Sequence, residues 1–501
     1  MLFRRSRRIG DCGKHTAVSA ASLLEPGRTC WRVEPADRFA CIVDGADYFR
    51  HAKAAMLRAR HRILLVGWDF DTRIALERGG STLPGPNRLG AFLQWMLWQQ
   101  PDLTIHLLKS NLRLLPAFDD LWYGITPVAL VNRLSSRRLH FAVDGAHPTG
   151  SVHHQKILVV DDAVAFCGGI DFTAERWDTS EHRHEHRLRR VLGRDYAPRH
   201  EVAVAVDGAA ARALGDLARE RWHTAVGRAL APVGSGHDTW PDTLQPALRH
   251  VDVGIARTMP LHAEQREIRE VETLNLTAIA AARDVIYLEN QYLASRAVVE
   301  ALAARLRDPA GPEVVVVLPR ASESRLEQES MDGARYRMLG LLWAADEHGR
   351  LGVFWPVTDG EKPIYVHSKV LVVDGRLLRI GSSNLNNRSM GFDSECDVAV
   401  EGPPNDPDDE VSRFVIATRQ RLICEHLGVS PEDFERLREA GMTFLEVVEA
   451  LRGTGRTLRR FTPRTVSDEA SLLAENDVMD PDHVPRSLTR SVQRFLRGLN
   501  K

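Results

Sequence analysis

One short segment occurs twice in this chain and decides its fold. It reads HQKILVVD at residues 154–161 and HSKVLVVD at residues 367–374, so both copies fit the pattern H-x-K-x(4)-D. After six more residues each copy is followed by a turn of small residues, GGID at 168–171 and GSSN at 381–384. Six or seven matched positions that recur 213 residues apart in a chain of 501 indicate an internal duplication.

The same order of predicted elements surrounds both copies. Strands and helices alternate, which is typical of α/β layers, and duplication on this scale indicates two packed copies of one fold. In the first half we predict helices at 46–60 and 89–100 and strands at 62–67, 103–108, 140–144, 153–160 and 201–208. In the second half we predict helices at 267–282, 297–306 and 326–346, strands at 284–288, 313–319, 351–355 and 397–402, and a hairpin that carries the second motif at 365–380.

Composition suggests where the halves begin and end. A stretch rich in proline and glycine, residues 232–241, interrupts the periodic pattern. The first residues are basic, and after about residue 430 the periodicity weakens into short helical pieces. We therefore expect a basic, flexible N-terminus (1–29), a first half (30–230), a linker (231–250), a second half (251–430) and a helical accessory segment (431–501).

The charge balance argues against a nucleic-acid-binding protein. The chain has 66 Lys and Arg against 67 Asp and Glu, a formal net charge of -1. Proteins that bind nucleic acid usually carry a basic surplus or a basic stripe. The local arginine groups at 183–190 and 456–460 are more typical of solvated faces.

Cysteine spacing and hydropathy exclude further classes. The six cysteines form no C-x-x-C pair, so neither a thiolate metal site nor a disulfide framework is indicated. No apolar run approaches the roughly 18 residues that a spanning helix needs. The basic start is followed by Asp11 and Lys14, which argues against an export signal. We expect a cytoplasmic or peripheral membrane protein, and secretion stays open.

The repeated histidine and lysine suit chemistry on a phosphodiester. Residues two apart in an extended strand point to one face, so His154 projects with Lys156, and His367 with Lys369. The lysines can neutralise non-bridging phosphate oxygens. An imidazole pKa near ~6.5 lets one ring attack phosphorus while the other protonates the leaving alcohol and later activates water. This mechanism needs no metal and no other cofactor.

Four further polar residues accompany the motifs. Asp161 and Asp374 fall at predicted hairpin turns, so a structural role is favoured over acid–base work. Asp171 and Asn384 lie on the small-residue turns, where they can orient phosphate oxygens or bond a histidine. His182 and its neighbours at 184 and 186 alternate with charged residues, which is more typical of an exposed loop than of a metal site.

Segments around the motifs resemble a known family. They are HHQK at 153–156, GGIDF at 168–172, RWDT at 176–179, IYLENQYL at 286–293, GSSNLNNRS at 381–389 and DSE at 393–395. Together they resemble the phospholipase D superfamily, and more narrowly the branch shared by eukaryotic phospholipases D and their bacterial relatives. The resemblance spans residues 30–428.

The resemblance implies a fold and residue roles. The fold is the phospholipase D-like one: two mixed-sheet α-β-α halves related by pseudo-twofold symmetry, with one shared active site. His154 is implied as nucleophile and His367 as general acid. An acidic residue is implied to hold the second nitrogen of each ring. Glu395 fits this role for His367, and Asp178 is the candidate for His154, with neighbouring glutamates left open.

The implied activity is that of a phospholipase D. Such an enzyme hydrolyses the distal phosphodiester of glycerophospholipids to phosphatidic acid and free headgroup, through a phosphohistidine, and also transfers the phosphatidyl group to alcohols. A nuclease or other phosphodiesterase on the same core and a phosphatidyltransferase of the cardiolipin synthase type stay open. The expected partners are a phospholipid at a membrane surface and water or an alcohol, with no nucleic acid, and we expect a monomer.

Overall fold

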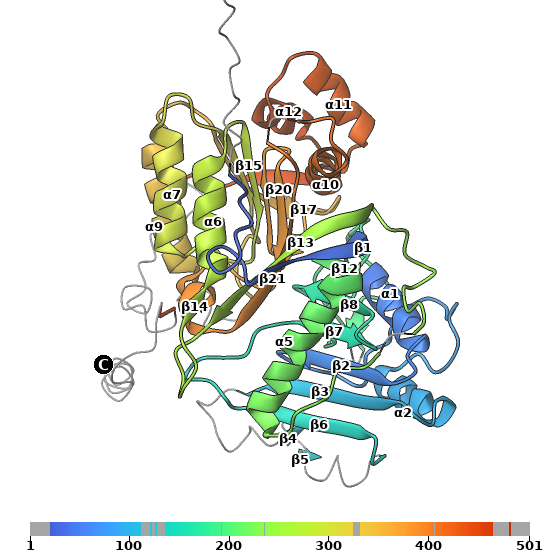
Figure 1. Cartoon of the computed structure of the whole chain (residues 1–501). Helices are drawn as coiled ribbons and strands as arrows, with labels where there is room; N and C mark the ends of the chain where they lie inside the picture. Colours follow the sequence, from blue (N-terminus) through green and yellow to red (C-terminus); the bar gives the residue numbers. More distant parts are fainter. Residues whose placement is uncertain are drawn as a thin grey trace, which may run out of the picture.

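Two long strands lie side by side at the centre of one large sheet (Figure 1). β1 (Arg32–Val43) and β13 (Leu248–Met259) pair antiparallel over most of their length. The computed structural model describes residues 21–111, 121–122, 126–127, 136–191, 193–234, 236–323, 331–404, 406–463 and 480–481. Because one strand comes from each half of the duplication, this pairing joins the halves into a single sheet.

From the central pair outward, the strand order is the same in both directions. Beyond β1 lie β12 (Val202–Asp207), β8 (Val164–Gly168), β7 (Ile157–Val160), β2 (Arg62–Gly67), β3 (Thr104–Ser110) and β6 (Leu139–Asp144). Beyond β13 lie β21 (Glu395–Glu401), β20 (Leu377–Gly381), β19 (Val370–Val373), β15 (Val285–Glu289), β16 (Glu313–Val317) and β17 (Leu351–Val357). The outer strands of both halves pair in parallel and the inner ones antiparallel, so the predicted mixed-sheet, pseudo-twofold α/β fold is confirmed.

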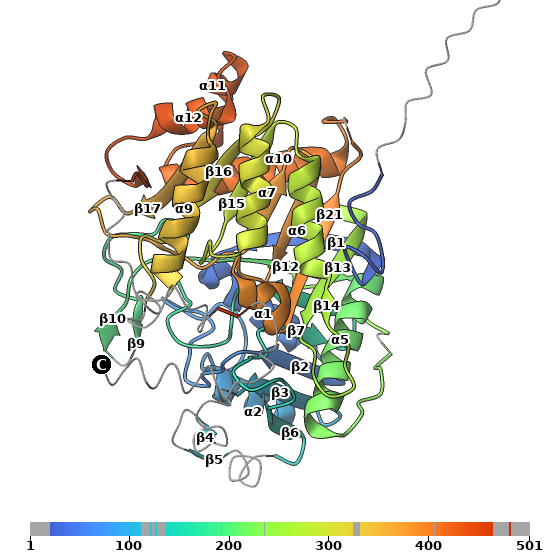
Figure 2. The ribbon, with the colours of Figure 1, turned by 90° about the vertical axis from the view of Figure 1, so that its left-hand side faces the viewer.

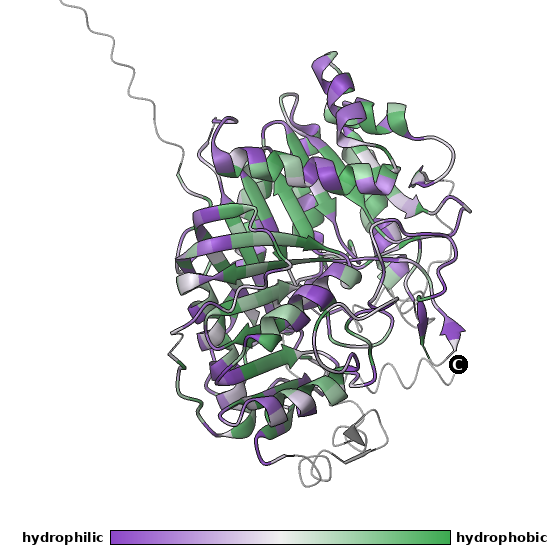
Figure 3. Ribbon diagram, turned by 90° about the vertical axis from the view of Figure 1, so that its right-hand side faces the viewer, coloured by the Kyte–Doolittle hydropathy of each residue, from purple (hydrophilic) through white to green (hydrophobic). Residues whose placement is uncertain are grey.

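Helices cover both faces of this sheet (Figures 1 and 2). One apolar core lies between the sheet and α5 (Gly208–Val226), α10 (Glu410–Leu427), α11 (Pro431–Glu439) and α12 (Phe444–Leu451). On the opposite face, one core lies under α1 (Gly45–Leu57) and α2 (Leu89–Gln99), and another under α6 (Glu270–Ala281), α7 (Arg296–Arg307) and α9 (Gly333–Ala345). Figure 3 shows the consequence: the buried strands are largely hydrophobic, and the helices carry their hydrophilic residues outward. Strands buried on both faces explain the valine-rich runs of the sequence.

The two central strands are not among the predicted elements. β1 contains Pro35 and exposed Asp37, so its sequence has neither a continuous apolar run nor a clean alternation. Proline is tolerated there because the ladder with β12 covers only Phe39–Val43, which leaves Pro35 with β13 as its one neighbour.

Three predicted boundaries differ from the structure. β13 starts at Leu248, inside the predicted linker. In the predicted flexible N-terminus, residues 21–29 pack against the second half: Leu23 and Leu24 are buried, and the N–H of Leu23 donates to Glu401. Beyond α12, β22 (Thr457–Arg460) adds an edge strand to β17, so the C-terminal segment is not purely helical. Residues 1–20 and most residues after 463 lie outside the described part of the chain.

Within the described residues, none of the helices combines the length and the apolarity that crossing a bilayer requires.

The last residue of each repeated motif is an aspartate that holds a hairpin turn. Asp161 and Asp374 both have positive φ, at 52° and 54°. Asp161 accepts the backbone N–H groups of residues 60–62 at 2.6–2.9 Å, and Asp374 those of residues 283–285 at 2.8–3.0 Å. Each aspartate therefore ties its motif hairpin to the start of a neighbouring strand, which fits the structural role expected of it.

Replacing Asp161 by alanine should lower the free energy of unfolding by about 3 kcal/mol, because three backbone donors at a fully buried carboxylate lose their acceptor. Chemical denaturation of the purified variant measures the change. Exposed Asp102, replaced by alanine, serves as control and should change stability little. Equal stability of the two variants would contradict the structural role.

Candidate active site

At each motif histidine the backbone crosses over to the other half and pairs with a segment there. β7 begins only at Ile157 and β19 only at Val370, so the His-x-Lys segments precede these strands rather than lying within them as predicted. The N–H of His154 donates to the carbonyl of Ser394 at 2.9 Å, and the N–H of His367 to the carbonyl of His200, also at 2.9 Å. The two crossings are parallel bridges and repeat the pseudo-twofold symmetry.

The crossing gives each histidine a glutamate from the opposite half. His154 Nδ1 lies 3.0 Å from both carboxylate oxygens of Glu395, and His367 Nδ1 lies 2.9 Å from Glu201 Oε2. Both glutamates are fully buried. The hydroxyls of Ser382 and Ser389 also donate to Glu395, at 2.5 and 2.6 Å, and fix its orientation.

The acidic partners predicted from the resemblance are therefore wrong. Glu395 holds His154 rather than His367, and Asp178 holds neither ring. Asp178 is instead bonded to His182 at 3.1 Å, to the guanidinium of Arg189 and to the backbone N–H of residue 199. The prediction took an acid that follows each motif within its own half, whereas the parallel crossing brings in the acid of the other half.

Glu201 is the functional residue that the sequence reasoning missed, although a signal was present. The segments EVAVAVD at 201–207 and ECDVAVE at 395–401 match in length and pattern, and each begins with glutamate. Two glutamates at equivalent places in a duplicated unit indicate equivalent roles.

The two lysines lie beside the histidines. Lys156 Nζ donates to the carbonyl of His154 at 3.0 Å and lies 3.2 Å from Asp171 Oδ2. Lys369 Nζ donates to the carbonyl of His367 at 2.5 Å and to the side-chain oxygen of Gln291 at 3.2 Å. Burial lowers the pKa of Lys369 well below its usual value, while Glu201 opposes the shift. Both ammonium groups are thus fixed next to the reacting rings.

The two turn residues are placed differently. Asp171 bonds Lys156 and accepts the N–H of Trp68 at 2.9 Å, so its carboxylate orients a lysine. Asn384 is 6% exposed, and within the described part of the chain its side-chain oxygen has no hydrogen-bond partner. A buried amide whose oxygen has no partner is available to a ligand, so Asn384 remains a candidate for phosphate binding.

Electrostatics favour neutral imidazoles in the resting site. Burial lowers the pKa of His154 well below its usual value, and Lys156 and Lys369 lower it further. The pKa of His367 is also well below its usual value, chiefly because of burial and next because of the charge of Lys369. A neutral ring can act as nucleophile, and a phosphate entering the site raises the proton affinity of the other ring.

The proton needed by an acid can be held in the His367–Glu201 pair. Burial raises the pKa of Glu201 to about 7, while Arg176 and Arg199 act in the opposite direction. Arg176 Nε lies 3.8 Å from Glu201 Oε1. Such a buried pair shares its proton, and its titration belongs to the pair as a whole.

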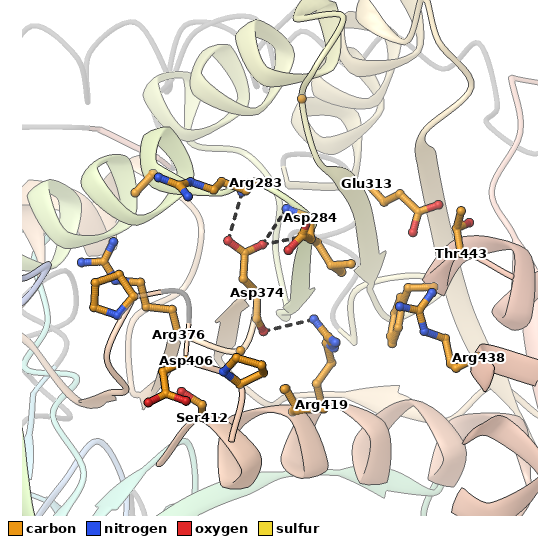
Figure 4. A pocket seen from close by; sticks show the side chains of 18 of the residues that line it. Arg283, Asp284, Glu313, Asp374, Arg376, Asp406, Ser412, Arg419, Arg438 and Thr443 are labelled. Carbon is orange, nitrogen blue, oxygen red and sulfur yellow. Dashed lines mark hydrogen bonds between the residues drawn. The ribbon is translucent and has the colours of Figure 1, made fainter. Parts of the chain in front are cut away.

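A separate polar pocket lies at the other end of the second motif (Figure 4). It has a volume of about 740 Å³ and is lined by Asp374, Arg419, Arg438 and Glu313 among others. Asp374 points its carboxylate at the backbone of residues 283–285, as drawn in Figure 4. Neither motif histidine lines this pocket, so it is distinct from the paired-histidine site.

The chain is similar to known proteins. A family model described as "Cardiolipin synthase, PLD-like domain" matches residues 276–413, and one described as "Phospholipase D" matches residues 357–472. Phospholipase D A of Dictyostelium discoideum is 25% identical over 78% of this chain and 35% of its own length. Phospholipase D2 of Bos taurus is 25% identical over 79% of this chain and 54% of its own length. This chain thus spans about a third to a half of these relatives.

A solved structure shares the fold. The phosphatidylserine synthase of Haemophilus influenzae superposes with a TM-score of 0.55 at 13% identity, over 81% of this chain and 94% of that one. The duplicated motif, the two-half sheet and the family matches together support the phospholipase D superfamily.

Proposed function

We propose that this protein is a phospholipase D that acts on glycerophospholipids at a membrane surface. The observation that carries the proposal is the pair of histidines, each held by a buried glutamate of the other half and each next to a lysine. Relatives named phospholipase D over most of this chain support the lipid substrate. The near-zero net charge is a further argument against a nucleic-acid substrate.

In the first step, Nε2 of His154 attacks phosphorus and the bond to the headgroup oxygen breaks. Glu395, bonded to Nδ1, stabilises the positive charge that the ring acquires. Lys156, Lys369 and Asn384 bind the non-bridging oxygens as charge shifts onto them. His367 gives its proton to the departing alkoxide, which leaves as the free alcohol, and a phosphatidyl-histidine remains.

In the second step, His367 takes a proton from water, which attacks the phosphohistidine and releases phosphatidic acid. An alcohol that enters instead gives a phosphatidyl alcohol, because the intermediate does not distinguish between two hydroxyl nucleophiles by its own chemistry. Neutral His154 is regenerated, and no redox change or metal is involved.

A phosphatidyltransferase is the second candidate. The match to the cardiolipin synthase-type model and the phosphatidylserine synthase fold favour it over a nuclease, since both names describe transfer of a phosphatidyl group. The two candidates share every step up to the phosphohistidine and differ only in the acceptor.

Incubation with phosphatidylcholine vesicles should release phosphatidic acid, and added ethanol should divert product to phosphatidylethanol. Thin-layer chromatography separates the products. Transfer to glycerol or phosphatidylglycerol with no hydrolysis in water would favour the transferase. Cleavage of single-stranded DNA, with none of phospholipid, would overturn the lipid proposal.

Replacing His154 by alanine should abolish turnover and the covalent intermediate, since no nucleophile remains. His367→Ala should lose ~10²–10⁴-fold with phospholipid, but retain phosphoenzyme formation from a nitrophenyl phosphodiester, whose leaving group needs no proton. Quenched-flow trapping with a radiolabelled substrate shows which residue carries phosphorus. Label on residue 367 would reverse the roles.

The two glutamates, each paired with a histidine of the other half, give a separate prediction. Glu395→Gln should impair attack on phospholipid and nitrophenyl substrates alike, because it acts on the nucleophile. Glu201→Gln should impair phospholipid cleavage by at least ~10²-fold and the nitrophenyl substrate far less, because it acts on the acid. Thermal unfolding of both variants controls for damage to the fold. The opposite leaving-group dependence would exchange the roles of His154 and His367.

A further inference from the structure

A second cluster of titratable side chains lies behind the His367–Glu201 pair. Its members are Asp44, His182, His200 and Glu425. Asp44 directly precedes α1, His182 lies in the loop between β8 and β12, His200 lies just before β12, and Glu425 is on α10. All four are buried, and the two histidines are fully so. The proposed mechanism uses none of them.

The facing atoms of this cluster have the spacing of metal ligands. His200 Nδ1 lies 2.9 Å from Glu425 Oε1 and 3.3 Å from Asp44 Oδ1. His182 Nε2 lies 3.3 Å from the same Glu425 oxygen and 3.6 Å from Asp44 Oδ2. Ligand atoms about 2.0–2.2 Å from a tetrahedral zinc ion lie about 3.3–3.6 Å apart. Three of the four separations fall in this range.

The outer nitrogens of both histidines are also engaged as in metal sites. His182 Nδ1 lies 3.1 Å from Asp178 Oδ2, and His200 Nε2 lies 2.9 Å from Glu289 Oε2. Histidines that bind a metal almost always give their other ring nitrogen to such a partner, which fixes the tautomer and the ring plane. Here each ring aims one nitrogen at the centre of the cluster and the other at a carboxylate.

Asp44 provides an independent sign of a missing partner. Its side chain is 1% exposed, and among the described residues its Oδ2 accepts no hydrogen bond. A buried carboxylate oxygen left without a donor is costly, and a cation at the centre of the cluster would satisfy it.

Two arrangements balance the charge of the cluster's own carboxylates. The buried carboxylates of Asp44 and Glu425 need two positive charges. Either both histidines carry an extra proton, or both are neutral and one divalent cation occupies the centre. Nitrogen and oxygen ligands in a closed four-coordinate set are the donors that zinc takes in structural sites.

We propose that Asp44, His182, His200 and Glu425 bind a structural zinc ion. The ion would fix the carboxylate that holds the general acid, because Asp44 Oδ1 accepts the N–H of Glu201 at 3.1 Å and the N–H of Asp44 donates to the carbonyl of Glu201 at 2.7 Å. It makes no contact with the phosphate in this arrangement, so phosphoryl transfer itself remains the work of the histidines and lysines.

The burial of His182 departs from the expectation of an exposed histidine loop, while the charged residues between the three histidines are exposed. Only His182 of the three alternating histidines enters the cluster. His184 Nδ1 lies 3.0 Å from the hydroxyl of Thr358, and the His186 ring packs edge-on against Trp177. His184 and His186 therefore provide controls from the same loop.

Elemental analysis of the full-length protein tests the proposal. The chain is produced without a metal-binding tag, dialysed against chelator to remove loosely bound ions and measured by inductively coupled plasma mass spectrometry. We expect about one zinc ion per chain. Denaturation with chelator and refolding with cobalt(II) should give the visible absorption of tetrahedral cobalt.

Variants identify the ligands. His182→Ala and Glu425→Gln should lose the bound zinc, while His184→Ala and His186→Ala should keep it. Asp178→Asn should weaken zinc binding ~10–100-fold, because it loosens the ring of His182 without removing a ligand. X-ray absorption at the zinc edge of the unmodified protein counts nitrogen and oxygen ligands even where a variant fails to fold.

Two results would overturn the zinc proposal. A folded, active protein that contains no stoichiometric metal, both as purified and after refolding with zinc, would assign the two charges to protons on His182 and His200. Bound zinc that persists in His182→Ala and Glu425→Gln would place the ion elsewhere.

Discussion

The antiparallel pairing of β1 with β13 is the interaction on which the rest of the structure depends. It makes one continuous sheet from two copies of a fold, with the halves related by a rotation about the centre of that sheet. The inner strands of both copies then meet at the axis, and the segments that precede β7 and β19 cross it. Without this pairing each half would keep its histidine and lysine but lose the glutamate that orients the ring.

The crossed histidine–glutamate pairs couple catalysis to the integrity of the whole chain. Glu395 and Glu201 are fully buried carboxyl groups, and each depends there on its hydrogen-bond partners. Removing one partner of a buried pair typically costs about 3–5 kcal/mol. A site assembled in this way is either complete or absent, because each half supplies one member of both pairs.

Buried polar groups extend well beyond the two reacting rings. Ser368, between His367 and Lys369, donates to Glu289, and Glu289 also accepts from Tyr287 and contacts His200 and His426. Among the residues that the structure describes, this network lies on the side of Glu201. The two halves are therefore alike in fold and unlike in electrostatics, and the asymmetry gives a physical basis for two imidazoles in matching positions to do different work.

The sequence by itself determined the duplication, the α/β class, the four motif residues His154, Lys156, His367 and Lys369 and the turn carboxylates at 161 and 374. These features depend on local spacing: a strand, a hairpin turn and a repeated pattern are readable from neighbours in the chain. Tertiary structure alone decided that the central strands pair across the axis, and hence that Glu395 serves His154 and Glu201 serves His367. It alone also brought Asp44, His182, His200 and Glu425 together from four distant segments. The physical reason is the same in both cases, because contacts between residues more than a hundred positions apart follow from how whole strands pack, and local periodicity carries no record of that packing.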